Sequence, residues 1–230
     1  MSDKPVHVVF PLFDGMTTLD FAAPYQVFSG VPAARVTVAS FGGRDIKSDG
    51  LVLTALADLT KIETCDVICV PGGFGTAKAM VDEAFMREIR RLAAGARYHT
   101  SVCTGALILG AAGLLRGKRA NTYWASRDTL KLFGAIIEEG RVVRDGNVIT
   151  GGGVTAGMDF ALMAVAEIFG RGTAEMVQLR LEYAPEPPFE ALHPDRAPAE
   201  ITAQLRNDMK AGLTADRVAA EEAARRLQVA

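Results

Sequence analysis

The stretch YHTSVCTGA, residues 98–106, decides the fold of this chain. Its first residues predict a strand that ends at Cys103, and the small residues after the cysteine predict the start of a helix. Cys103 is therefore expected at a strand-to-helix turn on the carboxyl edge of a sheet, where open α/β sheets bind ligands. The turn is similar to the nucleophile elbow of hydrolases, with sulfur in place of oxygen. The positive end of the helix dipole is expected to lower the pKa of the thiol.

Strands and helices alternate on both sides of this stretch. Apolar runs at residues 6–12 and 65–70 predict buried strands of a parallel sheet, and residues 35–41 predict a third strand. Turn residues at 48–50 and 144–147 predict two hairpins. Helices are predicted over residues 19–28, 76–94, 104–112, 122–133 and 155–169, and from 172 to 183, and Pro24 is placed where it could break the first of them. The alternation predicts an α/β fold with a mainly parallel sheet.

The C-terminal part differs in composition from the rest of the chain. Residues 184–198 hold five of the ten prolines and predict an extended arm. Residues 199–228 are helical by composition and mostly polar, which fits a helix on the surface or across a partner subunit. We therefore expect an α/β domain over residues 1–183 and a proline-rich arm with a C-terminal helix over residues 184–230.

Charge and cysteine content exclude several classes of protein. The net charge of -2 gives no electrostatic footprint for nucleic acid. No apolar run approaches 18 residues, and the N-terminus has no signal-peptide pattern, so no membrane partner is expected. Three cysteines without regular spacing favour a reducing compartment such as the cytoplasm.

The remaining cysteines and histidines offer little chemistry. Cys65 and Cys69 lie in or beside an apolar strand and are interpreted as packing residues. They lack a second cysteine pair or a nearby histidine, so no metal site is expected. His99 precedes Cys103 by four strand residues, roughly 13 Å at about 3.3 Å per residue, which is too far to act on the thiol.

Several longer motifs carry a resemblance to a known family. The segments FDG-x4-D, VPGGFG, SVCTGALILGAAGLLRGKRA, TYWA and ITGGGVTAGMDFAL resemble the PfpI-like branch of the class I glutamine-amidotransferase-like superfamily over about residues 5–185. Asp20, the cysteine block, the triple-glycine block and LEYAPEPPF are similar to those of isocyanide hydratases. The resemblance implies a flavodoxin-like three-layer sandwich, a homodimer, and no metal or organic cofactor. It also implies a small isocyanide substrate, to which water is added to give an N-substituted formamide.

The resemblance assigns roles to four residues of the expected site. Cys103 is implied as the nucleophile that forms a covalent thioimidate, and Asp20 as the group that moves protons. Many relatives carry a glutamate as this partner, and Asp20 could instead be a helix-start acid that complements the dipole. The backbone N–H groups of Gly73 and Thr104 are implied to hold a developing negative charge or a water. The need for a tight turn after the strand would by itself also explain a glycine at position 73.

Four further residues are candidates for the pocket wall. By resemblance, Gly152 and Val154 pack near the cysteine, although glycines 151–153 could also form an anion cradle. Tyr123 stands where many relatives carry a histidine, which weakens a protease or amidase hypothesis. Trp124 could line an apolar pocket or belong to the core.

Three alternatives remain beside the hydratase hypothesis. Cys103 could serve as a redox sensor that oxidises to a sulfinate. A glyoxalase or deglycase of the same superfamily is less consistent with Asp20 and Tyr123. A transcription regulator is not expected, because the C-terminal extension is too short for a paired DNA-binding module and is not basic.

Overall fold

The apolar run Val6–Leu12 forms strand β1 near the centre of the sheet, because its residues tolerate burial on both faces. The computed structural model describes residues 4–229, in which a seven-stranded sheet has the order β10-β11-β7-β6-β1-β2-β5. The neighbours of β1 are β2 (Ala34–Ser40) and β6 (Val67–Val70), and the other strands are β5 (Ala57–Asp58), β7 (Tyr98–Ser101), β10 (Val142–Asp145) and β11 (Val148–Gly151). Only the β10–β11 hairpin is antiparallel among these pairs.

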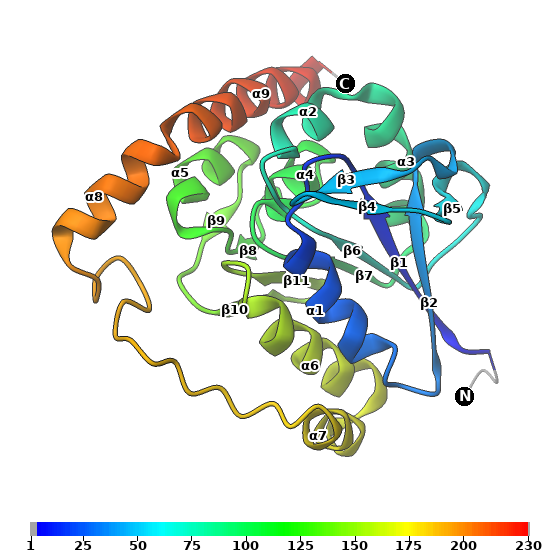
Figure 1. Cartoon of the computed structure of the whole chain (residues 1–230). Helices are drawn as coiled ribbons and strands as arrows, with labels where there is room; N and C mark the ends of the chain where they lie inside the picture. The colour runs from blue at the N-terminus through cyan, green and yellow to red at the C-terminus, as the bar shows by residue number, and fades with distance from the viewer. Residues whose placement is uncertain (1–3, 230) are drawn as a thin grey trace.

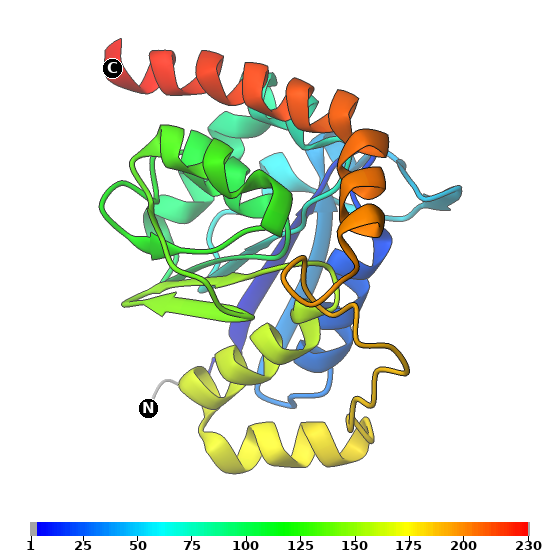
Figure 2. The same cartoon turned by 90° about the vertical axis from the view of Figure 1, so that its left-hand side faces the viewer.

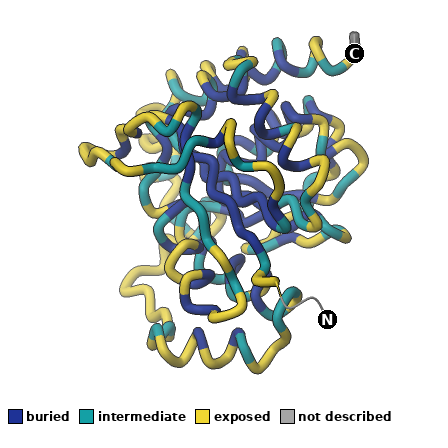
Figure 3. Tube along the Cα trace, turned by 90° about the vertical axis from the view of Figure 1, so that its right-hand side faces the viewer, coloured by how far each residue is buried: buried dark blue, intermediate teal, exposed yellow. Residues whose placement is uncertain are grey.

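Helices cover both faces of this sheet (Figures 1 and 2). One layer contains α1 (Thr18–Phe28), α6 (Ala156–Phe169) and α7 (Arg171–Arg180). The other contains α2 (Thr76–Val81), α3 (Glu83–Gly95), α4 (Gly105–Ala111) and α5 (Arg127–Leu130). The strands between the layers are largely buried (Figure 3). The arrangement confirms the predicted three-layer, flavodoxin-like α/β sandwich.

Smaller elements complete the chain between these layers. The predicted hairpin near residue 49 is β3 (Ile46–Ser48) with β4 (Leu51–Leu53). A second small sheet pairs β8 (Arg119–Ala120) with β9 (Ile136–Ile137). Short 3-10 turns are η1 (Phe41–Gly43), η2 (Leu59–Lys61), η3 (Trp124–Ser126) and η4 (Lys131–Phe133).

Three predicted helices differ from the observed ones. Helix α1 continues through Pro24 without a break. Residues 76–94 form two helices, because Asp82 caps α3 by accepting hydrogen bonds from the N–H groups of Ala84 and Phe85. Residues 122–133 form the short helix α5 between the 3-10 turns η3 and η4, and the hydroxyl of Thr122 donates to the carbonyl of Cys103 at 2.8 Å at the start of this segment.

The C-terminal helical segment packs against the α/β domain of the same chain. After the largely exposed arm come α8 (Ala199–Asp208) and α9 (Lys210–Val229), and α9 crosses the helical layer formed by α2 and α4 (Figure 2). Three alanines on the inner face of α9 are buried: Ala219, Ala220 and Ala223. No helix among the described residues is both long and apolar enough to cross a membrane.

Candidate active site

Cys103 lies at the turn between β7 and α4, as predicted. Its backbone adopts the left-handed region with φ of 55°, which costs energy for a residue other than glycine. Backbone hydrogen bonds hold this conformation, because the N–H of Cys103 donates to the carbonyls of Gly152 at 2.8 Å and Gly151 at 3.2 Å. The position of the sulfur is therefore set by the main chain of a neighbouring loop.

Two glycines allow the chain to pack closely around this turn. A Cβ atom on Gly72 would lie 2.4 Å from the nitrogen of Thr104, and one on Gly105 would lie 2.2 Å from the carbonyl oxygen of Val70. Both distances are far inside van der Waals contact, so only glycine fits without movement of the backbone. The loop after β6 and the cysteine turn are thus packed main chain against main chain.

Asp20 lies fully buried on α1, beside Cys103. Its Oδ2 accepts a hydrogen bond of 2.9 Å from the N–H of Gly72, whereas Oδ1 has no hydrogen-bond partner within residues 4–229. Burial raises the pKa of Asp20 to about 7, against the opposing effect of the Gly72 and Cys103 hydrogen-bond interactions. Near neutral pH this carboxyl can therefore both hold and release a proton.

The thiol of Cys103 has a raised pKa, so the expectation of a lowered one is wrong for this closed site. The residue is only 6% exposed, and burial is the largest cause, followed by the negative charge of Asp20. The N–H of Thr104 at the start of α4 acts in the other direction but does not outweigh burial. Cys103 and Asp20 consequently compete for one buried negative charge.

The two backbone donors expected around the sulfur have different partners. The N–H of Thr104 interacts with the sulfur of Cys103 itself. The N–H of Gly73 donates to Oγ1 of Thr104 at 2.9 Å, and this oxygen lies 2.8 Å from Oγ1 of Thr76. The Gly73 donor is therefore already engaged, and a substrate or water would have to replace the Thr104 hydroxyl to use it.

A cavity of about 310 Å³ opens over Cys103 and Thr104. Of the four predicted wall residues, Tyr123 and Val154 line it. Gly152 does not line it and instead binds the N–H of Cys103 through its carbonyl. Trp124 is also outside the lining, and its ring stacks against the guanidinium of Arg206, 4.5 Å away.

The far side of the cavity comes from residues that sequence reasoning missed. Helix α9 contributes Gly212, Leu213 and Asp216, and Met209 lies between α8 and α9. Other segments contribute Thr17, Asp49, Phe74 and Ser126, beside the predicted Gly73. A signal for α9 does exist, because Gly212, Asp216, Ala219, Ala220 and Ala223 recur at helical spacing and all but Gly212 are buried. An acid in such a stripe of small residues marks a buried carboxyl.

The other cysteines and His99 fit structural roles. Burial raises the pKa of both Cys65 and Cys69 to about 12, so their thiols stay protonated. The Nε2 atom of His99 lies 2.9 Å from the carbonyl oxygen of Ala93, on the helix that covers its strand. His99 therefore packs against a neighbouring layer, as the sequence predicts.

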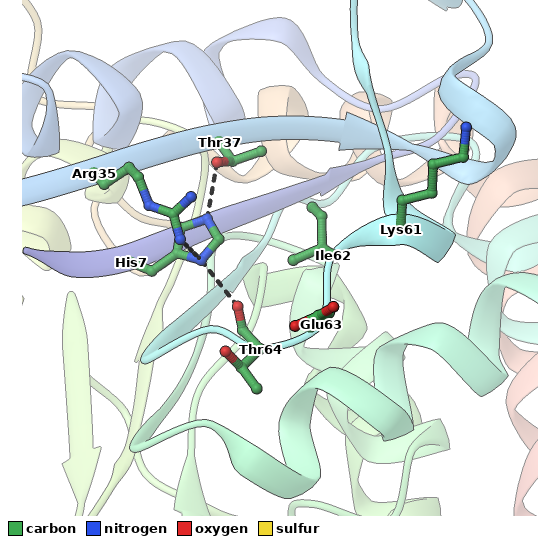
Figure 4. A pocket seen from close by; sticks show the side chains of 7 residues that line it. All are labelled: His7, Arg35, Thr37, Lys61, Ile62, Glu63 and Thr64. Carbon is green, nitrogen blue, oxygen red and sulfur yellow. Dashed lines mark hydrogen bonds between the residues drawn. The ribbon is translucent and has the colours of Figure 1, made fainter.

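A second cavity, of about 290 Å³, lies at the amino ends of β1 and β2 (Figure 4). Its polar groups bond to one another, since the ring of His7 contacts Oγ1 of Thr37 at 2.8 Å, the carbonyl oxygen of Thr64 at 2.9 Å and the guanidinium of Arg35 at 2.8 Å. The cavity lies at the opposite strand ends from Cys103. It is lined by His7, Arg35, Thr37, Lys61, Ile62, Glu63 and Thr64.

One group of side chains has the spacing of metal ligands. Glu139, His193 and Asp195 have ligand atoms within 4.8 Å of one another near the surface. Glu139 pairs with Arg127 at 3.0 Å, and His193 contacts Asp195 at 3.0 Å. These pairings account for the cluster without an ion.

Comparison with known proteins identifies the family of the chain. A family model for the DJ-1/PfpI family matches residues 6–167. The isonitrile hydratase of Pseudomonas putida is 45% identical over 228 residues, which cover 97% of this chain and 99% of that protein.

Solved structures extend the comparison. A THiJ/PfpI family protein from Pseudomonas syringae superposes with a TM-score of 0.91 at 38% identity, covering 94% of this chain and 90% of the other. Drosophila melanogaster DJ-1beta shares the fold alone, with a TM-score of 0.71 at 24% identity over 79% of this chain and all of the other. The buried cysteine turn, the sheet order and these matches lead to one assignment: the chain belongs to the DJ-1/PfpI family.

Proposed function

We propose that this chain is an isocyanide hydratase, an enzyme that adds water to an isocyanide and releases an N-substituted formamide. The observation that carries the proposal is the 45% identity to an isonitrile hydratase over 97% of the chain. The site supports it, because a strained cysteine and a buried carboxyl that can exchange a proton near neutral pH lie at the base of a cavity. We expect the enzyme to act without a metal or organic cofactor.

In the first step, the sulfur of Cys103 attacks the terminal carbon of the isocyanide. The thiol proton passes to Asp20, and Asp20 delivers it to the attacked carbon, so that a C–S bond and a C–H bond form. The product is a neutral thioimidate, and Asp20 is left ionised. The raised pKa of Asp20, about 7, suits a group that must take up and release a proton near neutral pH.

In the second step, water adds to the C=N bond of the thioimidate. Asp20 removes a proton from the water and returns it to the nitrogen, giving a tetrahedral adduct. The adduct collapses as its hydroxyl forms the formamide carbonyl, the C–S bond breaks, and the hydroxyl proton returns through Asp20 to the sulfur. The N–H of Thr104, and that of Gly73 once freed from the Thr104 hydroxyl, would hold the attacking water or the developing oxyanion.

The presence of Tyr123 in place of a histidine is compatible with this chemistry. Amide hydrolysis needs an acid that protonates an expelled amine, whereas an isocyanide expels no group. Tyr123 lines the cavity and its hydroxyl lies 3.5 Å from the sulfur of Met209. Its role in the proposal is to shape the wall, together with Val154, while Gly152 supports the cysteine and Trp124 supports α8 from outside the cavity.

The proposal also includes a homodimer in the cytoplasm. Family resemblance supports the dimer, and three free cysteines fit a reducing compartment. Size-exclusion chromatography with light scattering would report a mass of twice 24.5 kDa if the dimer forms.

Direct assay tests the proposed activity. Purified protein mixed with alkyl or aryl isocyanides should yield the matching formamide, detected by chromatography and mass spectrometry. Cys103→Ala and Cys103→Ser should abolish the reaction, while Cys65→Ala serves as the control for loss of a thiol outside the site. Absence of turnover across isocyanides of different bulk would refute the proposal.

The redox-sensor alternative has less support from the site. Oxidation of cysteine follows thiolate character and exposure, and Cys103 is 6% exposed and its thiol has a raised pKa.

The glyoxalase or deglycase alternative is tested with methylglyoxal. Consumption of methylglyoxal without turnover of isocyanides would favour that alternative.

A further inference from the structure

An unpaired hydroxyl lies on the wall of the cavity over Cys103. Ser126, at the end of η3, is only 1% exposed, and its Oγ has no hydrogen-bond partner within residues 4–229. An unsatisfied buried hydroxyl costs about 1–3 kcal/mol in a folded protein. Because Ser126 lines the cavity, a molecule bound there can supply the missing partner.

A second polar group enters the same cavity from α9. Asp216 is 7% exposed, and its carboxyl interacts with the backbone N–H of Ala77 in α2. Burial raises its pKa to about 7, so the carboxyl is protonated in a large fraction of molecules at neutral pH. In that form it both donates and accepts hydrogen bonds, as does the Ser126 hydroxyl.

The remaining walls of the cavity are mostly apolar. Phe74, Val154, Met209 and Leu213 supply hydrocarbon, aromatic and thioether surface. Of the other polar residues that line it, Thr17, Asp49 and Tyr123 are not buried. The hydroxyl of Thr104 is buried but is already bonded to the N–H of Gly73 and to the hydroxyl of Thr76. Ser126 and Asp216 are therefore the buried polar side chains on this wall that retain capacity for a ligand.

The orientation of a substrate follows from the position of the nucleophile. Resting on the proposed isocyanide chemistry, the reacting carbon must lie at Cys103, so the substituent on nitrogen extends into the cavity beneath α9. An apolar substituent would leave the Ser126 hydroxyl buried without a partner and the Asp216 carboxyl with the N–H of Ala77 alone, which is unfavourable. A substituent with a neutral group that donates and accepts hydrogen bonds would satisfy them.

We infer that Ser126 and Asp216 recognise a hydroxyl group on the substituent of the isocyanide, so that the preferred substrates are hydroxylated rather than plain alkyl isocyanides. A carboxylate substituent fits less well, because it would lie beside two acidic side chains, Asp49 and Asp216. An ammonium group would need Asp216 to remain ionised against its burial. The hydroxyl matches both side chains in their neutral forms.

The test compares two substrates that differ by one group: pentyl isocyanide and the same chain ending in a hydroxyl. We expect kcat/KM of the wild-type enzyme to be about tenfold or more higher for the hydroxylated substrate. Ser126→Ala and Asp216→Leu should each lower the ratio of kcat/KM for the hydroxylated substrate to kcat/KM for pentyl isocyanide about tenfold. Asp216→Asn should keep most of the preference that Asp216→Leu loses, because asparagine has both an acceptor and a donor. Asp208→Asn is the matched control, since Asp208 is an exposed acid at the end of α8, and it should leave kcat/KM for both substrates unchanged.

The possible results separate a recognition role from a structural one. If Asp216→Leu lowers kcat/KM equally for both substrates and also lowers the melting temperature, Asp216 only anchors α9, and the inference is overturned. The inference is also overturned if the wild-type enzyme has the same kcat/KM for the two substrates. The same holds if neither variant changes the ratio of the two kcat/KM values.

Failure of the proposed function has a different signature, namely no turnover of either isocyanide by the wild type. In that case, calorimetric binding of N-pentylformamide and its hydroxylated analogue to wild type and the same variants still decides the inference. A hydroxyl-dependent gain in affinity that Ser126→Ala removes would support it, and equal binding would overturn it.

Discussion

The Oδ2 atom of Asp20 accepts a hydrogen bond of 2.9 Å from the N–H of Gly72, and this bond fixes a buried carboxyl beside Cys103. Gly72 is itself packed against the nitrogen of Thr104, the residue that follows the cysteine. One short loop after β6 thus positions both partners of the Cys103–Asp20 pair. This arrangement explains why changes at either Asp20 or Gly72 should affect chemistry and stability differently.

Asp20→Asn should inactivate the enzyme while making the fold more stable at alkaline pH. Between about pH 4 and 7 the folded protein retains the Asp20 proton that the unfolded chain releases, so its contribution to stability declines as pH rises and is lowest above 7. Asparagine keeps an acceptor for Gly72 and removes this penalty. We expect a gain of about 1–4 kcal/mol at pH 8 and little gain near pH 4, measured by denaturant unfolding. A variant that is less stable than wild type at pH 8 would contradict the buried-charge account.

The rate should rise with pH and level off near pH 7. The productive Cys103–Asp20 pair holds one proton, and below the Asp20 pKa of about 7 it holds two. We therefore expect kcat/KM to fall about tenfold per pH unit below 7 and to stay level above it until the raised pKa of the thiol is reached. Isocyanides hydrolyse in acid without a catalyst, so the rate with Cys103→Ala must be subtracted at each pH. A profile that declines between pH 7 and 8 would argue against this assignment.

Gly72→Ala should destabilise the protein and remove activity together. The added methyl group would lie 2.4 Å from the nitrogen and 2.5 Å from the hydroxyl of Thr104, and main chain cannot move aside easily. We expect a loss of about 2 kcal/mol or more in the free energy of unfolding. Gly95→Ala is the control, because a Cβ at Gly95 meets no atom within 4 Å. Similar melting temperatures for the two variants would show that the close contact is not important.

Leu213→Ala should change which substrates are accepted more than how fast they react. Leu213 belongs to α9 and lines the cavity, so its truncation enlarges the space above Cys103. The ratio of kcat/KM for a bulky isocyanide to that for a small one should rise about tenfold, as expected for a few methylene groups in an apolar pocket. Val218→Ala, at a 59% exposed position of the same helix, should leave the ratio unchanged. A uniform decrease for all substrates would point to loss of packing instead.

The sequence was sufficient for the parts of the site that depend on local pattern. Apolar runs predict β1 and β6, and the strand–cysteine–small-residue pattern predicts the turn at Cys103. The pKa of Cys103 was predicted in the wrong direction, because the sequence displays a helix start but not the depth of burial that opposes it. The use of the Gly73 N–H by the Thr104 hydroxyl was equally hidden, since it joins residues 31 positions apart.

The C-terminal helix illustrates the same limit on a larger scale. Its mostly polar composition indicated a surface or a subunit contact, whereas its inward face of small residues and Asp216 covers the cavity. Polar helices of this kind bury only a narrow stripe, and composition averages that stripe away. Spacing between Gly212, Asp216 and the alanines after it was the available signal.

The position of α9 has a consequence for the family as a whole. Residues 6–167 match the DJ-1/PfpI family and contain the reacting pair, whereas Met209, Gly212, Leu213 and Asp216 come from outside that segment. Part of the cavity wall is thus encoded in a stretch of chain apart from the cysteine turn. Selection can rewrite the appended helix without disturbing the strained cysteine, so relatives that share the cysteine turn need not share a substrate, and exchange of this helix between them offers a route to new selectivity.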